Sequence, residues 1–516
     1  MECQTVYLNV AAMKSLPRAA SAGAWPQAVR LLERWLDRRE RVDALLAESP
    51  GPAAAAEATR DRARCQHLLV GAIRHLGRLN AAIDRLVPRA PRVRLRATLL
   101  VGGFELLEAG GAPDGEEQAA KVVHHAVAQA KTLLSPAEAG LVNAVLRKLA
   151  AAAELRAPPP GAEAGAAELA GHYSHPEWLV RRWLAQFGAG ATASLLGWNQ
   201  TPPPVYARWR APQESPPEWL QATVWPGFWL VPAGRWPEVE PLLAAGALYL
   251  QDPSTLAAAS LLDPQPGESV LDLCAAPGGK SLLLADLLEQ KLSVGDASDG
   301  AVAGLPADLS AEGQAKEEAL AKAGRVVAVD LPDERRIGRL KENLAKARRV
   351  AVALVGADVL KLTPALLAQQ GLPTAYPAIL LDAPCTNTGV IRHRVDVKWR
   401  LRETDVARHA AQQRALLAAA AKLVGSGPST GSGQAPSTSS GHSPSSGSGQ
   451  APSTGSGQGG RLVYSTCSLE PEENEQVVED FLRAAGGRWT LAAVRASRPW
   501  ESGCDGGSAF LLRRNA

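Results

Sequence analysis

The sequence has few cysteines, and none of them is spaced as in a disulfide framework or a metal site. Six occur in 516 residues, with no Cys-x-x-Cys pair: Cys3, Cys65, Cys274, Cys385, Cys467 and Cys504. Scattered cysteines in a chain of this length are typical of an intracellular protein whose thiols stay reduced. The pattern counts against a small secreted fold, and it predicts no metal site.

The sequence also lacks a signal peptide, a membrane span and a strong net charge. No basic stretch followed by an apolar core opens the chain, and no apolar run approaches the roughly 20 residues that span a bilayer. The net charge is +3, from 55 basic and 52 acidic residues, so any nucleic acid must be contacted through local basic patches. We expect a cytoplasmic, monomeric protein with no membrane partner.

Residues 1–155 show helical periodicity, which predicts an all-α domain. One long helix is predicted from apolar residues at three- and four-residue steps: Leu69, Ile73, Leu76, Leu79, Ile83 and Leu86. Further helices are predicted at 93–108, 116–133 and 136–153. Ser135 before Pro136, with Glu138 three residues after the serine, predicts the start of the last one.

Basic residues gather at one helix junction of this domain: Arg85, Arg89, Arg92, Arg94 and Arg96. Such a group fits a solvated charged surface and a contact with an RNA backbone about equally well. Both interpretations stay open at this point.

A linker rich in proline, glycine and alanine covers 156–168, and residues 169–240 predict a small α+β module. This module holds eight of the thirteen tryptophans: Trp178, Trp183, Trp198, Trp209, Trp219, Trp225, Trp229 and Trp236. Aromatic side chains can stack on unpaired bases, but most tryptophans in proteins belong to a core. We therefore expect core packing for the majority.

From residue 241 to 516, short apolar runs alternate with helical patterns, which predicts an α/β domain with a doubly wound, mostly parallel, Rossmann-like sheet. The predicted strands are 269–273, 326–329, 352–355, 378–381 and 461–464. Insertions interrupt the pattern at 291–323 and 425–460. The second consists almost wholly of small and polar residues that cannot bury apolar surface, so we expect a disordered surface loop.

A turn of small residues follows the first predicted strand, in the segment VLDLCAAPGGKS at 270–281. Glycines there let a ligand approach the backbone, and the following helix N-terminus favours a negative group. The turn matches neither G-x-G-x-x-G nor G-x-x-x-x-G-K-[ST], which counts against dinucleotide and P-loop sites. Asp330 and Asp358 end the next two strands. A single such aspartate is often a helix cap, but two beside this turn favour a nucleoside, with Asp330 on the ribose hydroxyls and Asp358 near the adenine.

Two cysteines and an aspartate follow the last two predicted strands. Asp382 and Cys385 stand in the segment DAPC, and Cys467 stands in STCS. The carboxyl ends of central strands in an open α/β sheet face one crevice, so these side chains should meet opposite the cofactor turn. Most lone cysteines are inert, but two thiols at this place indicate chemistry.

Methylation at carbon 5 of a pyrimidine needs this set of groups, because that carbon is a poor nucleophile. A thiolate that adds to C6, with an acid holding N3, activates C5, and a second thiol can assist breakdown of the adduct. Nearby cations such as Lys398 or Arg392 are candidates to stabilise the thiolate. The residues alone leave open which of Cys385 and Cys467 is the nucleophile.

The catalytic half resembles the RNA (cytosine-5) methyltransferases of the NOL/Sun type, most closely the bacterial RsmB (Fmu/Sun) family of 16S ribosomal RNA methyltransferases. The resemblance rests on QDPSTLAA (251–258), DLCAAPGGKS (272–281), LLDAPCTNTGVIRH (380–393), DVKWR (396–400) and LVYSTCSLEPEENEQVV (462–478). In the N-terminal half it extends to LVNAVLRKL (141–149) and SHPEWLVRRW (174–183). The helical domain there resembles the NusB-like RNA-binding domain of this family.

This resemblance implies a class I methyltransferase that uses S-adenosylmethionine on one cytosine of 16S ribosomal RNA, free or in an early assembly. It implies that the cofactor pocket is lined by Cys274, Ala275, Ala276, Pro277, Gly278, Gly279, Lys280, Asp330, Asp358 and Asp382. It also implies that Cys467 is the nucleophile, that Cys385 is the releasing thiol and that Asp382 holds the cytosine.

The sequence departs from the family pattern in two segments near the site. Arg394-Val395-Asp396 replaces a His-Pro-Asp that is common in the family, and residues 505–510 alter the final Asp-Gly-aromatic strand. Neither departure removes a catalytic group.

Two other functions are open to this sequence. One is methylation of another RNA, such as transfer RNA or 23S ribosomal RNA, against which the NusB-like domain argues. The other is a non-catalytic RNA-binding scaffold, against which the intact thiols and cofactor turn argue. A zinc deaminase is excluded because the H-x-E and P-C-x-x-C ligand set is absent.

Overall fold

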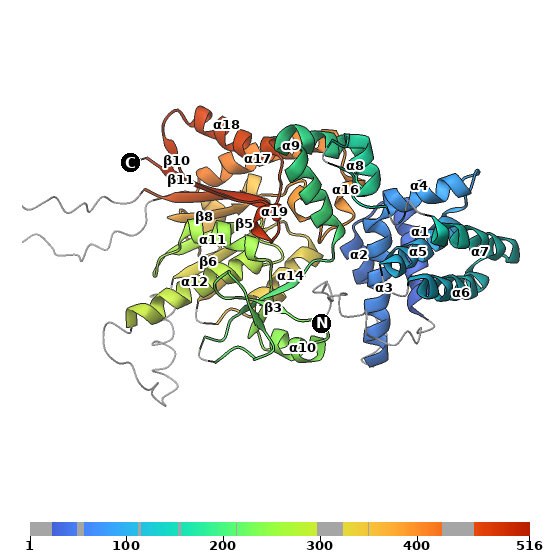
Figure 1. Ribbon diagram of the computed structural model, residues 1–516. Coiled ribbons are helices and arrows are strands. Elements are labelled where there is room, and N and C mark those ends of the chain that lie inside the picture. Colours follow the sequence, from blue (N-terminus) through green and yellow to red (C-terminus); the bar gives the residue numbers. More distant parts are fainter. Residues whose placement is uncertain are drawn as a thin grey trace, which may run out of the picture.

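A helical N-terminal domain lies at one end of the molecule, with a small module and a large α/β domain at the other (Figure 1). This arrangement is that of a computed structural model, which describes residues 23–48, 56–111, 115–152, 155, 157–161, 163–212, 214–296, 324–348, 350–425 and 459–515. Within these ranges no helix is both long enough and apolar enough to cross a membrane.

The N-terminal domain is built from α1 (Ala24–Arg38), α2 (Val42–Glu48), α3 (Ala56–Arg74), α4 (Leu76–Leu86), α5 (Val93–Gly110), α6 (Gly115–Leu133) and α7 (Pro136–Ala151). Helix α5 lies at its centre and contacts α1, α3, α6 and α7. Ser135 caps α7 in a capping box with Glu138, as predicted. The prediction of an all-α fold for this part of the chain is confirmed.

The single long helix predicted from Leu69 to Leu86 is wrong. The chain forms two helices there, α3 and α4, and they break at His75. The apolar periodicity continues across the break, so the local pattern carries no sign of it.

Contacts with other parts of the chain satisfy the open backbone groups at this break. The carbonyl of Ile73 accepts a hydrogen bond from Trp399 Nε1 at 2.8 Å, and that of Arg74 accepts one from Lys398 Nζ at 2.9 Å. Ser174 Oγ accepts hydrogen bonds from two backbone amides in the first turn of α4, at 2.7 and 3.3 Å. Helix ends need such partners, and here other domains supply them.

Three of the arginines at the predicted helix junction form ion pairs: Arg92 with Glu138, Arg94 with Glu33 and Arg96 with Asp84. All three pairs lie at the surface. They favour the interpretation of a solvated charged surface for these three side chains.

The small module consists of α8 (Ala166–His172), α9 (Glu177–Gln200), α10 (Trp236–Ala244), β1 (Val205–Trp209), β2 (Gln221–Ala222), β3 (Phe228–Val231) and β4 (Leu248–Leu250). Its strands form an antiparallel sheet in the order β2-β3-β1-β4. Because α8 begins before residue 169 and β4 follows residue 240, the module extends past both predicted boundaries.

Most tryptophans of this module lie in apolar cores, as we expected. Trp183 of α9 is fully buried. Others pack against apolar clusters of the module: Trp178, Trp209, Trp219, Trp229 and Trp236.

The large domain contains β5 (Ser269–Leu273), β6 (Arg325–Asp330), β7 (Ala351–Gly356), β8 (Ala378–Asp382), β9 (Arg461–Thr466), β10 (Trp489–Ser497) and β11 (Gly507–Arg514). Its helices are α11 (Leu256–Leu262), α12 (Gly279–Asp296), α14 (Glu334–Leu344), α15 (Pro364–Gln369), α16 (Val397–Arg400), α17 (Glu403–Ala421), α18 (Glu475–Ala485) and α19 (Pro499–Ser502). The sheet order is β10-β11-β9-β8-β5-β6-β7. Strands β5 to β9 run parallel, and β11 and β10 are antiparallel additions.

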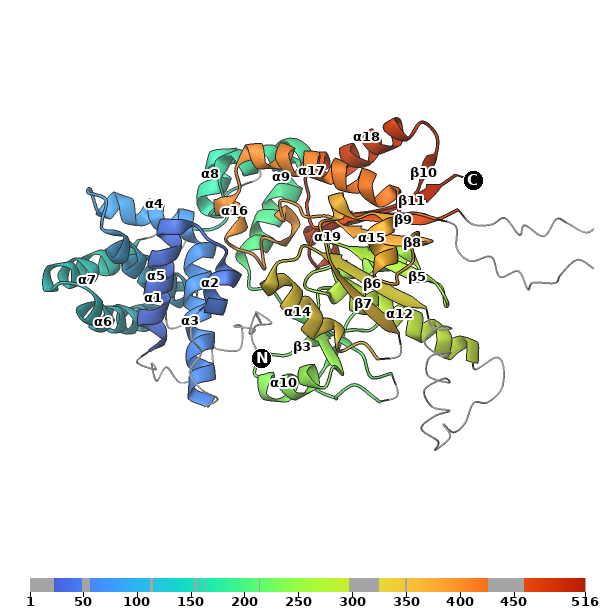
Figure 2. The same cartoon turned by 180° about the vertical axis from the view of Figure 1, so that it is seen from behind.

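Alternate residues of the central strands face opposite helical layers. Leu271 and Val327 pack with α15, α17 and α18, whereas Val270 and Val326 pack with α11 and α12. Figure 2 shows α17 and α18 on one side of the sheet and α12 and α14 on the other. Since both faces are covered, the prediction of a doubly wound, mostly parallel sheet is confirmed.

The first predicted insertion begins later than residue 291, because α12 continues to Asp296. The remainder of that insertion lies outside the described residues. So does the segment predicted to be disordered at 425–460, apart from its two ends.

Candidate active site

The thiols of Cys385 and Cys467 meet at the carboxyl ends of two adjacent strands. Strands β8 and β9 run parallel, with Asp382 opposite Ser465. The Sγ atoms of Cys385 and Cys467 lie 3.3 Å apart, at which distance one thiol donates a hydrogen bond to the other sulfur. The structure therefore brings together the residues that the sequence predicted at this edge.

The surroundings of Cys467 favour its thiolate. The hydrogen bond from Cys385 lowers the pKa of Cys467, and burial opposes this effect. The positive charges of Arg394 and Lys280 lower the pKa further, while the negative charge of Asp382 raises it. The net result is a pKa below the ordinary value of a thiol.

The surroundings of Cys385 act in the opposite sense. Its hydrogen bond to Cys467, its burial, and the negative charges of Cys467 and Glu473 raise the pKa of Cys385 well above the ordinary value. Asn387 bridges the pair, because its Nδ2 donates to the Cys385 carbonyl at 2.7 Å and its Oδ1 accepts from Cys467 Sγ at 3.3 Å. The pKa shifts make Cys467 the more acidic of the two thiols, and while Cys467 keeps its proton it donates to Asn387.

Lys398 and Arg392 lie away from the thiols, so the prediction that one of them stabilises the thiolate is wrong. Lys398 is fully buried and donates to the Arg74 carbonyl in the N-terminal domain. Arg392 donates to backbone carbonyls of the small module, and its guanidinium carbon lies 3.9 Å from the ring centroid of Trp198. Both residues are near Cys385 in the sequence, which suggested that they lie near the thiols. In the folded protein both side chains contact other domains instead.

Asp382 is held between two hydrogen-bond donors at the mouth of the site. Lys280 Nζ donates to Oδ2 at 2.7 Å, and Ser465 Oγ donates to Oδ1 at 2.9 Å. The Asp382 side chain keeps 30% of its surface exposed. This carboxylate is thus fixed in position and still reachable by a polar ligand.

The predicted cofactor turn joins β5 to α12 beside these residues. Cys274 adopts a positive φ of 61°, and Gly278 has φ 105° with its Cα facing Leu340, where a Cβ would lie 3.0 Å from a methyl carbon. Backbone atoms fix the turn: Ala275 N donates to the Val329 carbonyl at 3.0 Å, Ala276 N donates to Asp330 Oδ2 at 2.7 Å, and the Pro277 carbonyl accepts from Asn343 at 2.8 Å. Helix α12 begins at Gly279, so its first amides have no acceptor within the helix.

Asp330 lies at the end of β6, where it was predicted, but Arg336 covers it. Arg336 Nε and Nη2 donate to the Asp330 carboxylate at 2.6 and 3.0 Å. The Arg336 side chain is 43% exposed, so a ribose that took its place would displace it into solvent. Asp358 follows β7 and caps the short helix Val359–Lys361 by accepting from Leu360 N at 3.0 Å.

Asp272 is a residue of this site that the sequence reasoning missed. It is fully buried in β5; Ser281 Oγ donates to its Oδ2, and its Oδ1 has no hydrogen-bond partner among the described residues. Burial raises the pKa of Asp272 to about 7. Its position inside an apolar strand was the available signal, because a buried acid needs a partner.

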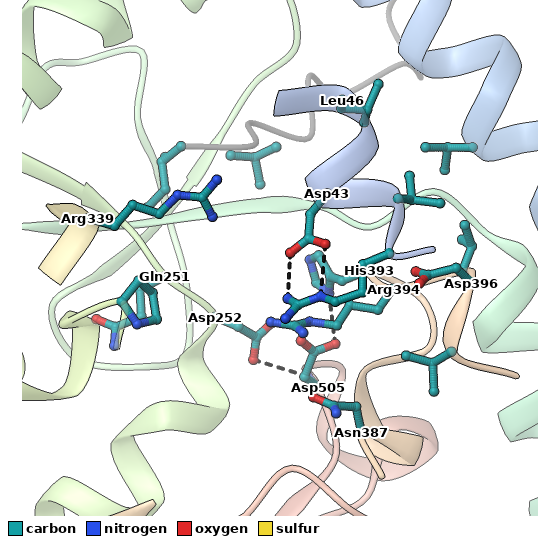
Figure 3. A pocket seen from close by; sticks show the side chains of 18 of the residues that line it. Asp43, Leu46, Gln251, Asp252, Arg339, Asn387, His393, Arg394, Asp396 and Asp505 are labelled. Atoms are coloured by element: carbon teal, nitrogen blue, oxygen red, sulfur yellow. Dashed lines mark hydrogen bonds and ion pairs between the residues drawn. The ribbon is translucent and has the colours of Figure 1, made fainter. Parts of the chain in front are cut away.

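A cavity of about 1010 Å³ opens in front of Cys385. Its walls come from α2 and α3 of the N-terminal domain, from the small module, and from the loop after β8. Asp43 of α2 lies on its wall in an ion pair with Arg41, and Figure 3 shows it close to Arg394 and His393, with Asn387 below them. A substrate in this cavity would touch all three parts of the chain.

The two segments that depart from the family pattern form part of this wall. His393 Nδ1 lies 2.9 Å from Asp505 Oδ1, and the Asp505 backbone N–H donates to Asp252 Oδ1 at 3.1 Å. One nitrogen or carboxylate oxygen from each of His393, Asp505 and Asp252 lies within 4.8 Å of the other two, and these hydrogen bonds account for that closeness. Val395 is buried in the apolar core of the N-terminal domain. The residues that differ from the family pattern therefore make contacts between domains, and they do not change the arrangement of the two thiols.

Comparison with known proteins connects this geometry to a family. The family described as 16S rRNA methyltransferase RsmB/F matches residues 259–300, 315–434 and 450–505, and the NusB family matches residues 25–151. A ribosomal RNA small subunit methyltransferase B from Serratia proteamaculans (strain 568) is 30% identical over 439 residues, which cover 82% of each chain. This chain belongs to the RsmB/F methyltransferase family.

Two further comparisons agree with this membership. A protein of the same name from Yersinia pestis bv. Antiqua (strain Angola) is 28% identical over 471 residues, which cover 88% of this chain and 89% of the relative. The crystal structure of PH0851 superposes with a TM-score of 0.64 at 21% identity and covers 97% of this chain and 99% of that chain. The second likeness shows that the fold is shared along the chain.

The RsmB/F chain is a ribosomal RNA methyltransferase, and S-adenosylmethionine is its cofactor. The residues at the turn fit that molecule. The unpartnered Oδ1 of Asp272 is a buried acceptor suited to an ammonium group, and Asp330 offers a carboxylate for ribose hydroxyls once Arg336 moves.

Proposed function

We propose that this methyltransferase modifies carbon 5 of a specific cytosine in 16S ribosomal RNA through a covalent bond between Cys467 and C6 of the base. The observation that carries the proposal is the pair of sulfurs 3.3 Å apart, one favouring its thiolate and the other its proton. Asp382 and the cofactor turn flank this pair. Pyrimidine C5 methylation needs such a nucleophile together with a second group for release.

The residues would act in a fixed order. The Cys467 thiolate forms a bond to C6 as the C5–C6 π electron pair moves to C5, and the Asp382 carboxylate, held by Lys280, accepts from the N4 amino group on the N3 edge of the base. Bound S-adenosylmethionine supplies the methyl group as an electrophile. A base then takes the C5 proton, the C–H electron pair forms the C5–C6 double bond, and the S–C6 electron pair returns to Cys467. Cys385, beside that sulfur, assists this release.

The cavity supports recognition of an unpaired base. Its walls include basic side chains from the N-terminal domain and from the large domain: Arg41, Arg62, Arg339, Lys346, Arg394 and Arg400. Such groups contact phosphates, and a base would have to rotate out of its stack to reach Cys385 at the cavity wall and Cys467 beside it. We further propose that the protein acts as a monomer, in the cytoplasm, on free or early-assembly 16S RNA.

Bisulfite sequencing of ribosomal RNA from a strain that lacks this protein tests the proposal. In the strain that lacks the protein, we expect one cytosine of 16S RNA to become sensitive to deamination by bisulfite. Its resistance should return when the wild-type gene is restored. Loss of protection in transfer RNA or 23S RNA instead would show another substrate. No change in any RNA, together with no binding of S-adenosylmethionine in calorimetry, would leave only a scaffold.

A further inference from the structure

The strand pairing leaves the two thiols beyond the sheet. The register between β8 and β9 ends with Asp382 opposite Ser465, and Ala383 N donates to the Ser465 carbonyl at 2.9 Å. Cys385 and Cys467 follow this last pair. Their spacing of 3.3 Å therefore depends on contacts between the two loops that follow the strands.

Glu473 joins these two loops through one buried carboxylate. It ends the short helix Pro471–Glu473 and is fully buried. It accepts hydrogen bonds from the backbone N of Thr386 at 2.9 Å, from the hydroxyl of Thr386 and from the hydroxyl of Ser468. Thr386 follows Cys385, and Ser468 follows Cys467, so Glu473 binds the residue next to each thiol.

Further hydrogen bonds hold Glu473 in this position. Gln413 Nε2 of α17 donates to Glu473 Oε1 at 3.0 Å and to the Pro384 carbonyl at 3.0 Å. The Tyr464 hydroxyl donates to the Glu473 backbone carbonyl at 2.6 Å. A carboxylate accepts from all these donors at once, whereas the amide N–H groups of a glutamine would meet the two hydroxyls only if these turned to accept.

We propose that Glu473 is a positioning residue for both thiols, which fixes the loops so that Cys385 can share its proton with Cys467. This inference rests on the proposed function only in assuming that the two thiols react with the cytosine; the positioning of the thiols does not depend on it. The hydrogen bonds of Glu473 run to the neighbours of the cysteines, so it acts through them.

The charge of Glu473 works in the same direction as its hydrogen bonds. Its negative charge raises the pKa of Cys385, the thiol that is to stay protonated. The charged groups that face Cys467 are Asp382, Arg394 and Lys280, and the cations favour its thiolate. Loss of Glu473 would thus lower the pKa of Cys385 and bring it closer to the pKa of Cys467.

The chain offers a matched control in the preceding residue. Glu472 stands on the same short helix, but its side chain is 31% exposed and pairs with Arg182. Glu472→Gln removes one surface ion pair and leaves the loop contacts of Glu473 intact.

The test compares Glu473→Gln with Glu472→Gln in the full-length protein without RNA. Alkylation of Cys467 by iodoacetamide is followed against pH by mass spectrometry of the peptide. In Glu473→Gln we expect the midpoint for Cys467 to rise by about one unit, which lowers its reactivity roughly tenfold below the midpoint. The effective concentration of Cys385 toward Cys467, measured from disulfide formation as oxidised glutathione is reduced to two thiols, should fall at least tenfold. Glu472→Gln should match the wild type in both readouts.

Wild-type values of both readouts in a folded Glu473→Gln protein would overturn the proposal. If that variant does not fold, Thr386→Val decides, because it removes one hydroxyl donor and keeps the backbone amide. A smaller shift in the same direction supports the proposal, and wild-type behaviour overturns it. Neither readout needs RNA or cofactor, so these results stand apart from the fate of the proposed function.

Discussion

Asp272 combines full burial with a carboxylate oxygen that lacks a hydrogen-bond partner among the described residues. Burial raises its pKa to about 7, so much of the acid is protonated near neutral pH. A cation bound at that oxygen would favour the charged form. The methionine ammonium of the cofactor is such a cation, and its binding at Asp272 would make affinity for the cofactor depend on pH.

We predict that affinity for S-adenosylmethionine falls as the pH drops below about 7, the pKa of Asp272 in the free protein. Asp272→Asn should bind about 10- to 100-fold more weakly, as expected for loss of a charged hydrogen bond, and its affinity should be flat between pH 6 and about 8. Calorimetric titration over this range measures both effects. Asp358→Asn serves as the control, since an asparagine can still cap the helix after β7, and it should keep the pH dependence. A pH-independent affinity in the wild type would refute this role of Asp272.

The same shift predicts the effect of Asp272 on stability without cofactor. The pKa is higher in the folded than in the unfolded chain, so the stability linked to this proton is present at low pH and is lost as the pH rises through about 7. Asp272→Asn should therefore unfold at a higher temperature than the wild type at about pH 8, and the difference should shrink toward pH 5. Thermal unfolding at both pH values checks this sign. Equal midpoints at the higher pH would contradict it.

Sequence reasoning found the site residues whose role follows from position at a strand end, namely Asp382, Cys385 and Cys467. It missed Asp272 and Glu473, because their importance comes from what surrounds them after folding. The choice of thiol was left open by the residues and was made by family resemblance. The opposite pKa shifts of the two sulfurs now support the same choice on physical grounds.

At the scale of elements, the break between α3 and α4 shows how domains shape one another. The local sequence predicts one helix, but Ser174 of the small module holds the amides that begin α4. The strand β5 is predictable from the sequence because it is apolar on both faces. The start of α7 is predictable because its capping residues, Ser135 and Glu138, are three positions apart in the chain. The break was not predictable, since its cause lies about 100 residues away in the chain.

We predict that Ser174→Ala destabilises the protein by about 1 kcal/mol, as loss of a helix cap does. Ser135→Ala removes the cap of α7 at a similar cost and provides the comparison. Hydrogen exchange separates the two, because only Ser174→Ala should speed exchange of the Gly77 and Arg78 amides. Unchanged exchange at these amides would show that Ser174 does not cap α4.

The segment rich in glycine and serine between α17 and β9 carries a prediction from sequence alone. Its composition cannot support a core, so deletion of residues 430–455 should leave methylation activity within a few-fold of the wild type. Activity assays and the thermal midpoint of the deletion variant measure this. A variant that fails to fold would contradict the interpretation.

At the scale of the whole molecule, residues 394–400 join the catalytic domain to the N-terminal helices. Val395 is buried in the helical core, Lys398 and Trp399 satisfy carbonyls of α3, and Arg400 donates to the Arg39 carbonyl at 2.9 Å. This segment directly follows the loop that carries Cys385 and Asn387. The N-terminal domain is therefore part of the cavity wall as well as a separate helical unit (Figure 3).

We predict that Trp399→Ala costs about 3 kcal/mol and lets the helical domain unfold in a separate transition. Trp399→Phe keeps most of the apolar contact and loses the hydrogen bond to Ile73, at a cost of about 1 kcal/mol. Urea unfolding followed by circular dichroism distinguishes the two variants. A single transition at the wild-type midpoint in both would show that the segment does not couple the domains.

The most direct measurement of the mechanism compares Cys385→Ala with Cys467→Ala after incubation with a 16S RNA fragment and S-adenosylmethionine. We predict that Cys385→Ala accumulates a covalent protein–RNA species, seen as a slow band in a denaturing gel and as the summed mass of both partners. Cys467→Ala should form no such species and should not methylate the RNA. Adduct formation by Cys467→Ala, or by neither variant, would contradict the account that Cys467 bonds to the base.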